Sequence, residues 1–319
     1  NLPEVMENSK SNKTYGLDGS VAAWIHDDNK DGIIAGADDH VYLYFGMRRG
    51  GNYIYSVDVT NRGKPELRWM IKGGTGDYTE LGQTWSNVNV EKIKDGTNEK
   101  TVLIFGGGYD RDQDSATVTS EDTEGRTIYI ADATTGARLW TAGRDAATPT
   151  VTMNYSVPAR VKPLDISGDG YIDRLYAADM GGQIFRFDID NTNGRSLSTS
   201  ITGGILADLA EASEAAADRV AENARRFYYP PDVSLVDGPD GKYHGLVIAS
   251  GFRAHPLNDD IHDRIYMIKD RNTGLIKNSA DYKYDPDSLT AGPMTEDDLH
   301  NATANIAGGN AANACLLYT

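Results

Sequence analysis

Apolar and polar residues alternate along the chain over short runs, and glycines separate these runs into pairs. Period-two alternation with aromatic and β-branched residues is typical of β-strands, and glycine between two such runs indicates a hairpin or a bulge. The pattern occurs at residues 41–61, 101–136, 173–191 and 245–274. The second run of each pair closes on an aspartate, and these are Asp58, Asp132, Asp188 and Asp270.

Each closing aspartate precedes a turn of Asn, Thr or Gly, in which its carboxylate can accept backbone N–H groups. The four aspartates follow one another at spacings of 74, 56 and 82 residues. Recurring hairpins of this kind predict an all-β protein whose hairpins are blades of a β-propeller with inserted loops. A β-sandwich is the alternative that the pattern leaves open.

One segment breaks the strand pattern. Residues 203–227 are rich in Ala, Glu and Arg, with apolar residues at helical spacing, and Pro230 and Pro231 follow. We therefore predict a helical insertion near 205–226.

The organisation predicted along the chain is simple. We expect residues 1–280 to be a fragment of a single propeller domain, and 281–319 to be an irregular tail or the start of a further blade. The chain begins at Asn1 without a methionine or an apolar leader, so we interpret it as part of a longer protein. The final residues, which include Cys315, fit no upstream pattern and are interpreted as an artefact of cloning or assembly.

Composition narrows the classes of function. The 319 residues carry a formal net charge of −16, which argues against nucleic acid because phosphate binding needs clustered Lys and Arg. An acidic surface suits divalent cations. The sequence has no apolar run long enough to span a membrane, and its single cysteine, Cys315, excludes an intrachain disulfide.

The stretch "LDISGDGYID" has the ligand spacing of a calcium loop. An EF-hand loop places oxygen ligands at positions 1, 3, 5, 7, 9 and 12, with glycine at position 6. With Asp165 at position 1, the successive positions are filled by Ser167, Asp169, Gly170, the carbonyl of Tyr171 and Asp173. Position 12 lacks the usual Glu, so Asp173 would supply the last carboxylate of a compact nine-residue loop.

A second loop upstream has the same spacing. With Asp27 at position 1, the ligands would be Asn29, Asp31, the carbonyl of Ile33 and Asp38 at position 12, with Gly32 at position 6. A turn rich in Asp, Asn and Gly without a metal is the alternative. Because suitable residues fill the same positions twice in one chain, we predict Ca²⁺ at both loops.

No residue set in the sequence nominates an enzyme. Nucleophile elbows, phosphate loops and dinucleotide signatures are absent from it. The motif "ADATTGARLW" at 131–140 resembles the docking motif of quinoprotein dehydrogenases, propellers that bind pyrroloquinoline quinone (PQQ) and Ca²⁺. In those proteins the tryptophan packs between blades and the aspartate caps the turn. A PQQ-dependent oxidoreductase on the same fold is therefore the alternative to a non-enzymatic protein.

Five segments together resemble the PilC/PilY1 family of type IV pilus biogenesis factors and adhesins, in its C-terminal β-propeller. They are "DHVYLYFGMRRGGNYIYSVDVT" (39–60), "LGQTWSNVNVEKI" (81–93), "VLIFGGGYD" (102–110), "DISGDGYIDRLYAADMGGQIFRFDI" (165–189) and "RRFYYPPDVSLV" (225–236). The likeness covers most of residues 15 to 275.

The resemblance implies a quinoprotein-like propeller with modified blades, exported to the pilus or outer-membrane surface of a Gram-negative bacterium, or to its periplasm. It implies that Ca²⁺ occupancy of the loop regulates pilus extension against retraction, with pilin or minor pilins as partners. It also implies a contribution to cell adhesion through a host-cell receptor. Ser167 stands where the family more often has Asp or Asn, so we expect a neutral, weaker ligand there.

Overall fold

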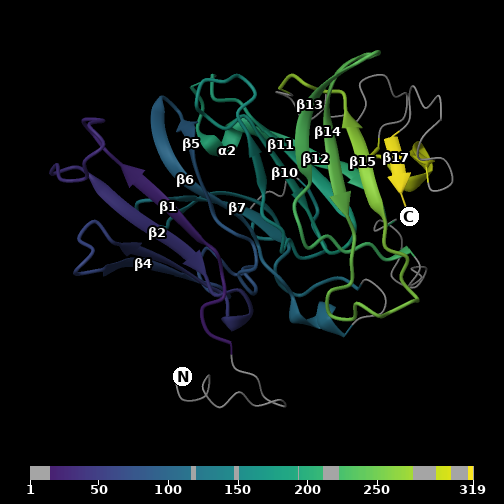
Figure 1. Cartoon of the computed structure of the whole chain (residues 1–319), viewed down its shortest axis with the longest axis horizontal. Helices are drawn as coiled ribbons and strands as arrows, with labels where there is room; N and C mark the ends of the chain where they lie inside the picture. The colour runs from purple at the N-terminus through teal and green to yellow at the C-terminus, as the bar shows by residue number, and fades with distance from the viewer. Residues whose placement is uncertain are drawn as a thin grey trace.

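The computed structural model describes residues 15–115, 120–146, 151–192, 194–210, 223–275, 292–302 and 315–318. Within these residues the chain folds into β-sheets that follow one another in chain order and lie side by side (Figure 1). Each of the first three sheets is a four-stranded antiparallel meander, in which every strand pairs with the next along the chain. The fourth begins in the same way and is then extended by two strands from the C-terminal part.

The strands are grouped by sheet as follows. The first sheet consists of β1 (Val21–His26), β2 (His40–Gly46), β3 (Tyr53–Asp58) and β4 (Glu66–Lys72). The second consists of β5 (Asn89–Asp95), β6 (Asn98–Gly106), β7 (Thr127–Asp132) and β8 (Arg138–Gly143). The third consists of β9 (Lys162–Leu164), β10 (Arg174–Ala178), β11 (Gln183–Ile189) and β12 (Ile201–Asp208).

The fourth sheet has the order β13 (Asp232–Gly238), β14 (Gly241–Ala249), β15 (Ile265–Asp270), β17 (Cys315–Tyr318) and β16 (Leu299–Asn301). The parts of 281–319 that the structure describes therefore include two strands of this sheet. In the part of the chain that the structure describes, helical structure is confined to short segments, which are η1 (Arg48–Gly50), η2 (Arg111–Asp114), α2 (Leu197–Ser200) and η5 (Glu296–Asp298). Among the described residues, no helix has the length and hydropathy of a membrane span.

The four hairpins predicted from the sequence are confirmed as the second and third strands of the four sheets. The flanking strands β1, β4, β5, β8, β9, β12 and β13 were not predicted. The alternation of apolar and polar residues is weaker in these strands because they are partly exposed. In β1, for example, every second residue faces solvent. In the second and third sheets the middle strands are the most apolar, because both of their faces are largely covered.

Strand β6 illustrates how consecutive sheets pack. Leu103 and Phe105 point towards the first sheet and join a core with Tyr44. Val102 and Ile104 point the other way, into the core shared with Phe185 of the third sheet. A strand buried on both faces loses polar alternation, and each large apolar side chain that it buries contributes roughly 1.5–3 kcal/mol.

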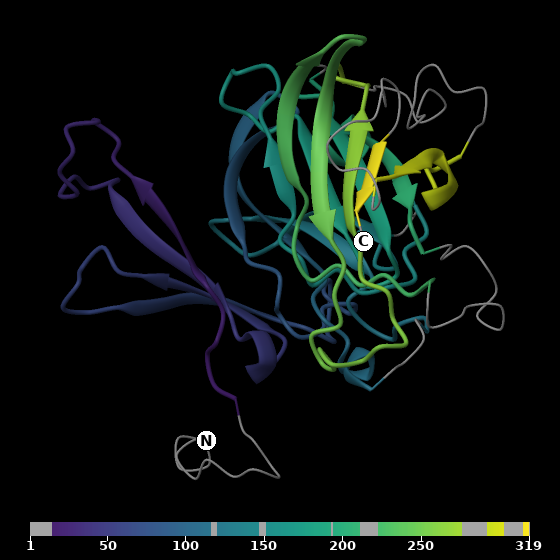
Figure 2. The same cartoon turned by 45° about the vertical axis from the view of Figure 1, so that its right-hand side comes forward.

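The third sheet packs on the fourth in the same manner. Tyr176 and Ile184 share a core with Leu246 and Tyr266 of the fourth sheet. Four sheets that each pack face to face on the next, in chain order, form consecutive blades of a β-propeller and not the two layers of a sandwich. Figure 2 displays the first sheet at one end of the row and the fourth at the other.

The motif at 131–140 has the structural role expected of it. Trp140 on β8 meets Phe187 of β11 edge to face, with ring centroids 5.4 Å apart, and so packs between the second and third sheets. Asp132 accepts N–H bonds from Thr134 at 2.8 Å and from Thr135 at 3.0 Å. The turn of this blade is therefore capped by its closing aspartate.

Two details of the sequence interpretation are corrected. Of the predicted helix near 205–226, the residues up to Asp208 belong to β12, because they pair with β11, and residues 211–222 lie outside the described part. The turn after β11 is capped by Asp190, which accepts the N–H of Thr192 at 3.1 Å. Asp188, expected to cap it, is instead buried in an ion-pair network.

Candidate metal centre

The loop at 165–173 connects β9 to β10 at the edge of the third sheet. Its ends are held together because the N–H of Asp173 donates to the carbonyl of Leu164 at 2.9 Å. Three of the predicted ligands meet here: one carboxylate oxygen from each of Asp165, Asp169 and Asp173 lies within 4.8 Å of the other two. Asp165 and Asp169 are exposed, whereas Asp173 is 3% exposed.

The backbone of the loop turns sharply at two glycines. Gly168 and Gly170 have φ angles of +75° and +89°, the left-handed region that L side chains avoid. The turn wraps the backbone around Asp165, whose carboxylate accepts the N–H groups of Gly168 at 2.7 Å and Gly170 at 2.8 Å. Asp169 accepts the N–H of Tyr171 at 3.0 Å. The glycine at position 6 is thus required by the conformation that gathers the carboxylates.

Asp173 holds the loop from its buried side. Its Oδ2 accepts the N–H groups of Ile166 at 3.0 Å and Ser167 at 2.8 Å. Its Oδ1 accepts from Nδ2 of Asn191 at 3.2 Å, and the same amide donates to the carbonyl of Ile172 at 2.9 Å. Asn191 was not identified from the sequence, because it lies 18 residues further along and meets the loop only in the folded sheet.

The remaining loop side chains divide between solvent and core. Ser167 places its Oγ 3.4 Å from Oδ1 of Asp165, which makes it a neutral neighbour of the carboxylates. Ile172 is buried in the core between the second and third sheets. Its N–H donates to the carbonyl of Lys92 on β5 at 2.9 Å, so the loop is also fixed to the second sheet.

Tyr171 adds a second tie to the second sheet. Its hydroxyl donates to Glu99 on β6 at 2.7 Å, and the ammonium of Lys94 lies 4.4 Å from its ring centroid. The hydrogen bond from Tyr171 lowers the pKa of Glu99, and the same bond raises the pKa of Tyr171. The side chain is engaged away from the aspartates, which leaves only the backbone carbonyl of Tyr171 as a candidate ligand.

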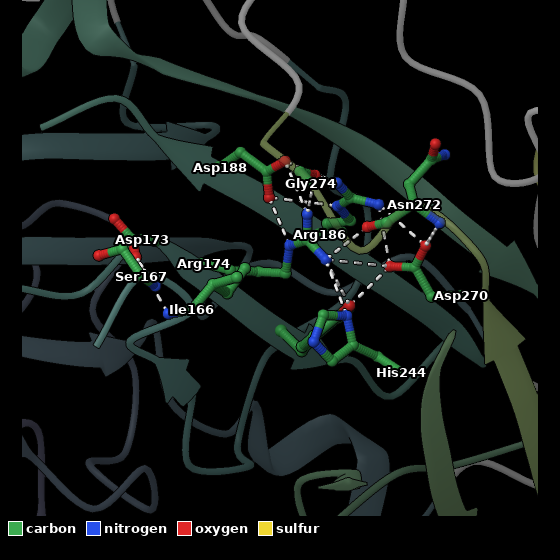
Figure 3. Close-up of polar contacts among 11 residues, drawn as sticks. Ile166, Ser167, Asp173, Arg174, Arg186, Asp188, His244, Asp270, Asn272 and Gly274 are labelled. Atoms are coloured by element: carbon green, nitrogen blue, oxygen red, sulfur yellow. Dashed lines mark hydrogen bonds and ion pairs between the residues drawn. The ribbon is translucent and has the colours of Figure 1, made fainter. Parts of the chain in front are cut away.

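Arg174, the residue after the loop, leads into the interface between the third and fourth sheets. Figure 3 places Asp173 and Ser167 beside this buried network. The guanidinium of Arg174 pairs with Asp188 at 2.7 Å and donates to the carbonyls of Asn272 at 2.7 Å and Gly274 at 2.6 Å. Those carbonyls follow β15 of the fourth sheet, so the first residue of β10 bridges two blades.

The network is closed by charges of opposite sign. Arg186 pairs with Asp188 at 2.6 Å and with Asp270 at 2.9 Å. Burial tends to raise the pKa of Asp188, but hydrogen bonds from Arg186 and Arg174 outweigh it and hold the pKa below its usual value. Burial and the charge of Arg174 lower the pKa of His244, whose Nδ1 lies 3.1 Å from Arg174. A neutral imidazole therefore accepts a hydrogen bond from the guanidinium.

The upstream loop between β1 and β2 has the same backbone plan. Left-handed residues occur at positions 4 and 6, Lys30 with φ +57° and Gly32 with φ +80°. Asp27 accepts the N–H of Gly32 at 2.7 Å, and Asp31 accepts the N–H of Ile33 at 2.7 Å. These bonds repeat those of Asp165 and Asp169 position by position. Asn29 accepts the N–H of Asp31 at 2.9 Å.

The closing carboxylate of this loop differs from the prediction. Asp38 is exposed, and the inward position is taken by its neighbour Asp39, which is 6% exposed. Asp39 accepts the N–H groups of Asp28 at 2.9 Å and Gly36 at 2.6 Å, and these bonds lower its pKa. It is thus the counterpart of Asp173. Position counting selected Asp38, because it could not account for the extra residues between Gly32 and β2.

Both loops offer oxygen donors alone, the set that hard divalent cations prefer. In the upstream loop, Oδ1 of Asp27 is buried and makes no hydrogen bond in the described part of the chain. A buried carboxylate oxygen without a partner carries an energetic cost that a cation would remove. The residues present therefore fit a metal ion at each loop, and three carboxylates gather more tightly at 165–173.

Comparison with known proteins bears on the identity of the chain. No protein-family model matches it. The type IV pilus biogenesis factor PilY1 of Pseudomonas aeruginosa strain PAO1 is 29% identical over 153 residues, 47% of this chain and 11% of that protein. PilY1 of strain UCBPP-PA14 is 26% identical over 271 residues, 80% of this chain and 22% of that protein. The chain thus spans about a fifth or less of these relatives.

The solved structures include a protein with a similar fold. The crystal structure of the Pseudomonas aeruginosa PilY1 C-terminal domain superimposes with a TM-score of 0.58 at 20% sequence identity. The superposition covers 89% of this chain and 53% of that one. Together with the consecutive blades, these likenesses show a β-propeller fold and a similarity to the PilY1 proteins.

Proposed function

We propose that this chain is the calcium-binding β-propeller part of a type IV pilus biogenesis protein, and that it acts without catalysing a reaction. The proposal rests chiefly on the loop at 165–173, where three carboxylates converge on a backbone shaped for them. The PilY1 proteins that it resembles are type IV pilus biogenesis factors, and this likeness supports a role in pilus biogenesis.

The proposed ligands at this loop are Asp165, Ser167, Asp169, the carbonyl of Tyr171 and Asp173. Ca²⁺ takes six to eight oxygens in flexible geometry, whereas Mg²⁺ demands a strict octahedron and keeps several waters. Three carboxylates beside one hydroxyl and one carbonyl, on an exposed loop with room for water, favour Ca²⁺. A bound Ca²⁺ supplies two positive charges that offset the repulsion among the aspartates.

The effect of binding reaches the blade interface through the chain itself. Asp173 is directly followed by Arg174, whose side chain is fully buried and bridges the third and fourth sheets. Fixing Asp173 fixes the start of β10, and with it the position of that guanidinium. We propose that occupancy of the loop stabilises this interface as well as the loop.

The upstream loop is proposed as a second, weaker Ca²⁺ site. Its ligands would be Asp27, Asn29, Asp31 and the inward-facing Asp39, in place of Asp38. The carbonyl of Ile33 already accepts the N–H of Ala35 at 3.1 Å, which reduces its capacity as a ligand. Its three carboxylates do not converge as closely as those at 165–173, which predicts a lower affinity.

In the whole protein, we propose that Ca²⁺ occupancy regulates pilus extension against retraction, with pilin or minor pilins as partners. The protein would be exported to the pilus or outer-membrane surface of a Gram-negative bacterium and would contribute to adhesion. These proposals rest on the likeness to PilY1, of which the chain spans only a part.

The binding proposal is tested by calorimetric titration of the chain with Ca²⁺. We expect one tighter and one weaker site, loss of the tighter one in Asp165→Ala, and loss of the weaker one in Asp27→Ala. Asp77→Ala, an exposed acidic residue in neither loop, is the matched control. Equal affinities in all three variants and the parent would refute the site assignment.

The cellular proposal needs the full-length protein. Carrying Asp165→Ala in its own bacterium, we expect the balance of surface pili and surface motility to lose its dependence on external Ca²⁺. Unchanged Ca²⁺-dependent piliation, in a strain whose protein has lost the tighter site in vitro, would separate a structural ion from a regulatory one and reject the regulatory role.

A further inference from the structure

A cavity of about 180 Å³ lies where the first strands of the four sheets begin. Ser20 precedes β1, Asn87 precedes β5, Arg160 precedes β9 and Pro230 precedes β13, and all four residues line it. The entry segments of successive propeller blades converge on the axis of the fold, so this cavity is axial. Its remaining lining residues are Asp18, Arg48, Trp85, Pro158, Tyr228, Tyr229 and Arg253.

The charge of this cavity is opposite to that of the molecule. Arg48, Arg160 and Arg253 line it together with one carboxylate, Asp18, although the chain as a whole carries −16. Asp18 lies 3.5 Å from Arg48. Within the described residues, no carboxylate lies within 4.0 Å of Arg160 or Arg253. The guanidiniums of Arg160 and Arg253 therefore have no ion-pair partner among the described residues.

Two of the three guanidiniums, those of Arg48 and Arg253, lie over a buried aromatic ring. Trp85 is buried and its ring lies 4.5 Å from that of Tyr109. The guanidinium carbons of Arg48 and Arg253 lie 4.7 and 5.3 Å from the centroid of the Trp85 ring. A guanidinium over an aromatic face is held by cation–π attraction while its N–H edge stays available to an acceptor. Arg253 is thus positioned by the Trp85 ring and not by a carboxylate of the described residues.

We propose that this axial cavity binds a compact organic anion with two or more carboxylates. Planar guanidinium forks match carboxylates with paired, charge-assisted N–H···O bonds. The three arginines and one aspartate of the lining carry a net charge of +2, which favours a ligand with more than one carboxylate. Ser20, Asn87 and the hydroxyl of Tyr229 offer neutral donors around the same space.

The site is separate from the proposed Ca²⁺ loop. The short strand β9 lies between them, because Arg160 precedes it and Asp165 follows it. No ligand of the proposed Ca²⁺ sites lines the cavity. The inference therefore stands whether or not the loop binds Ca²⁺.

The test is a calorimetric titration of the full chain with propane-1,2,3-tricarboxylate in Ca²⁺-free buffer of low ionic strength. We expect saturable binding that weakens as salt is added. Arg253→Gln and Arg160→Gln should each weaken it roughly tenfold or more, the size of effect expected for a lost charge-assisted bond. Arg62→Gln, which removes an exposed charge outside the cavity, should leave it unchanged.

Several outcomes would overturn the proposal. They are the absence of saturable binding, equal weakening by Arg62→Gln, or inorganic phosphate binding as tightly as the tricarboxylate, since the last would indicate a phosphate site. Asp169→Asn should preserve tricarboxylate binding, which separates this site from the Ca²⁺ loop. Both single arginine variants should fold, because both side chains are exposed, so their binding decides the question.

Discussion

Replacing Asp169 by Asn should change the stability of the chain in opposite directions with and without Ca²⁺. Oδ1 of Asp169 accepts the N–H of Tyr171, and the amide oxygen of Asn can accept the same bond. The substitution therefore preserves the turn while it removes one of three gathered negative charges. Without the ion that loss relieves repulsion, and with the ion it removes a charged ligand.

The size of the effect follows from the geometry. The ligand oxygens of Asp165, Asp169 and Asp173 lie within 4.8 Å of one another, and neutralising Asp169 removes two of the three repulsive pairs. Coulomb's law gives about 0.9 kcal/mol for each pair at that distance in water, hence about 2 kcal/mol for two pairs at low salt. Physiological salt screens part of this, which leaves about 1 kcal/mol. Ca²⁺ at one hundred times its Kd would stabilise the parent by about 2.7 kcal/mol.

The assay is thermal unfolding of parent and variant in chelator and in saturating Ca²⁺. One kcal/mol corresponds to about 2–4 °C in domains of 150–250 residues, so we expect Asp169→Asn to melt a few degrees higher than the parent in chelator. In Ca²⁺ it should melt below the parent. A variant that melts lower than the parent in both conditions by the same amount would refute the charge argument.

Three further predictions concern residues outside the ligand set. Arg174→Met should lower the free energy of unfolding by about 3 kcal/mol in urea titration, because it leaves buried acceptors and part of the charge of Asp188 unpaired. Burial, with the charges of Asp110 and Asp112, raises the pKa of Glu124 to about 7 from an ordinary 4.5. The folded state thus favours the protonated form of Glu124. The stability that this form contributes is fully present below pH 4.5 and is lost as the pH rises through 7. Glu124→Gln should match the parent at pH 4 and exceed its stability by about 1–3 kcal/mol at pH 8, as judged by denaturant midpoints. Gly170→Ala should cost about 1 kcal/mol and weaken Ca²⁺ binding, since φ is +89° there although no neighbouring atom lies within 4 Å of the added carbon.

The middle strands of each blade were predictable because they are locally consistent. Their apolar alternation, the glycines between them and the closing aspartates are properties of neighbouring residues. The outer strands were missed because their pairing depends on a sheet edge that the local sequence does not encode. The same limit applies to residues 203–208, whose small and apolar residues suit either a helix or a strand. They form β12 because they pair with β11.

The candidate metal loop divides in a similar way. Spacing alone nominated Asp165, Asp169 and Asp173, because ligands within nine residues are brought together by one local turn. Asn191 holds the loop at 165–173, and Asp39 closes the upstream loop. Both residues reach their positions through the path of the chain after the loop. Counting positions along the sequence does not predict that path.

The sequence by itself determined the blade hairpins, the left-handed glycine turns and the acidic loops, since each arises from contacts within a few residues. Only the tertiary structure decided that Asp188 pairs with arginines instead of capping a turn, and that arginines from different segments meet at the axis. The physical reason is the range of the interactions. Turn geometry and hydrophobic alternation are local, whereas buried ion pairs and axial cavities are assembled from residues 14 to more than 90 positions apart, as in Arg174–Asp188 and Arg160–Arg253.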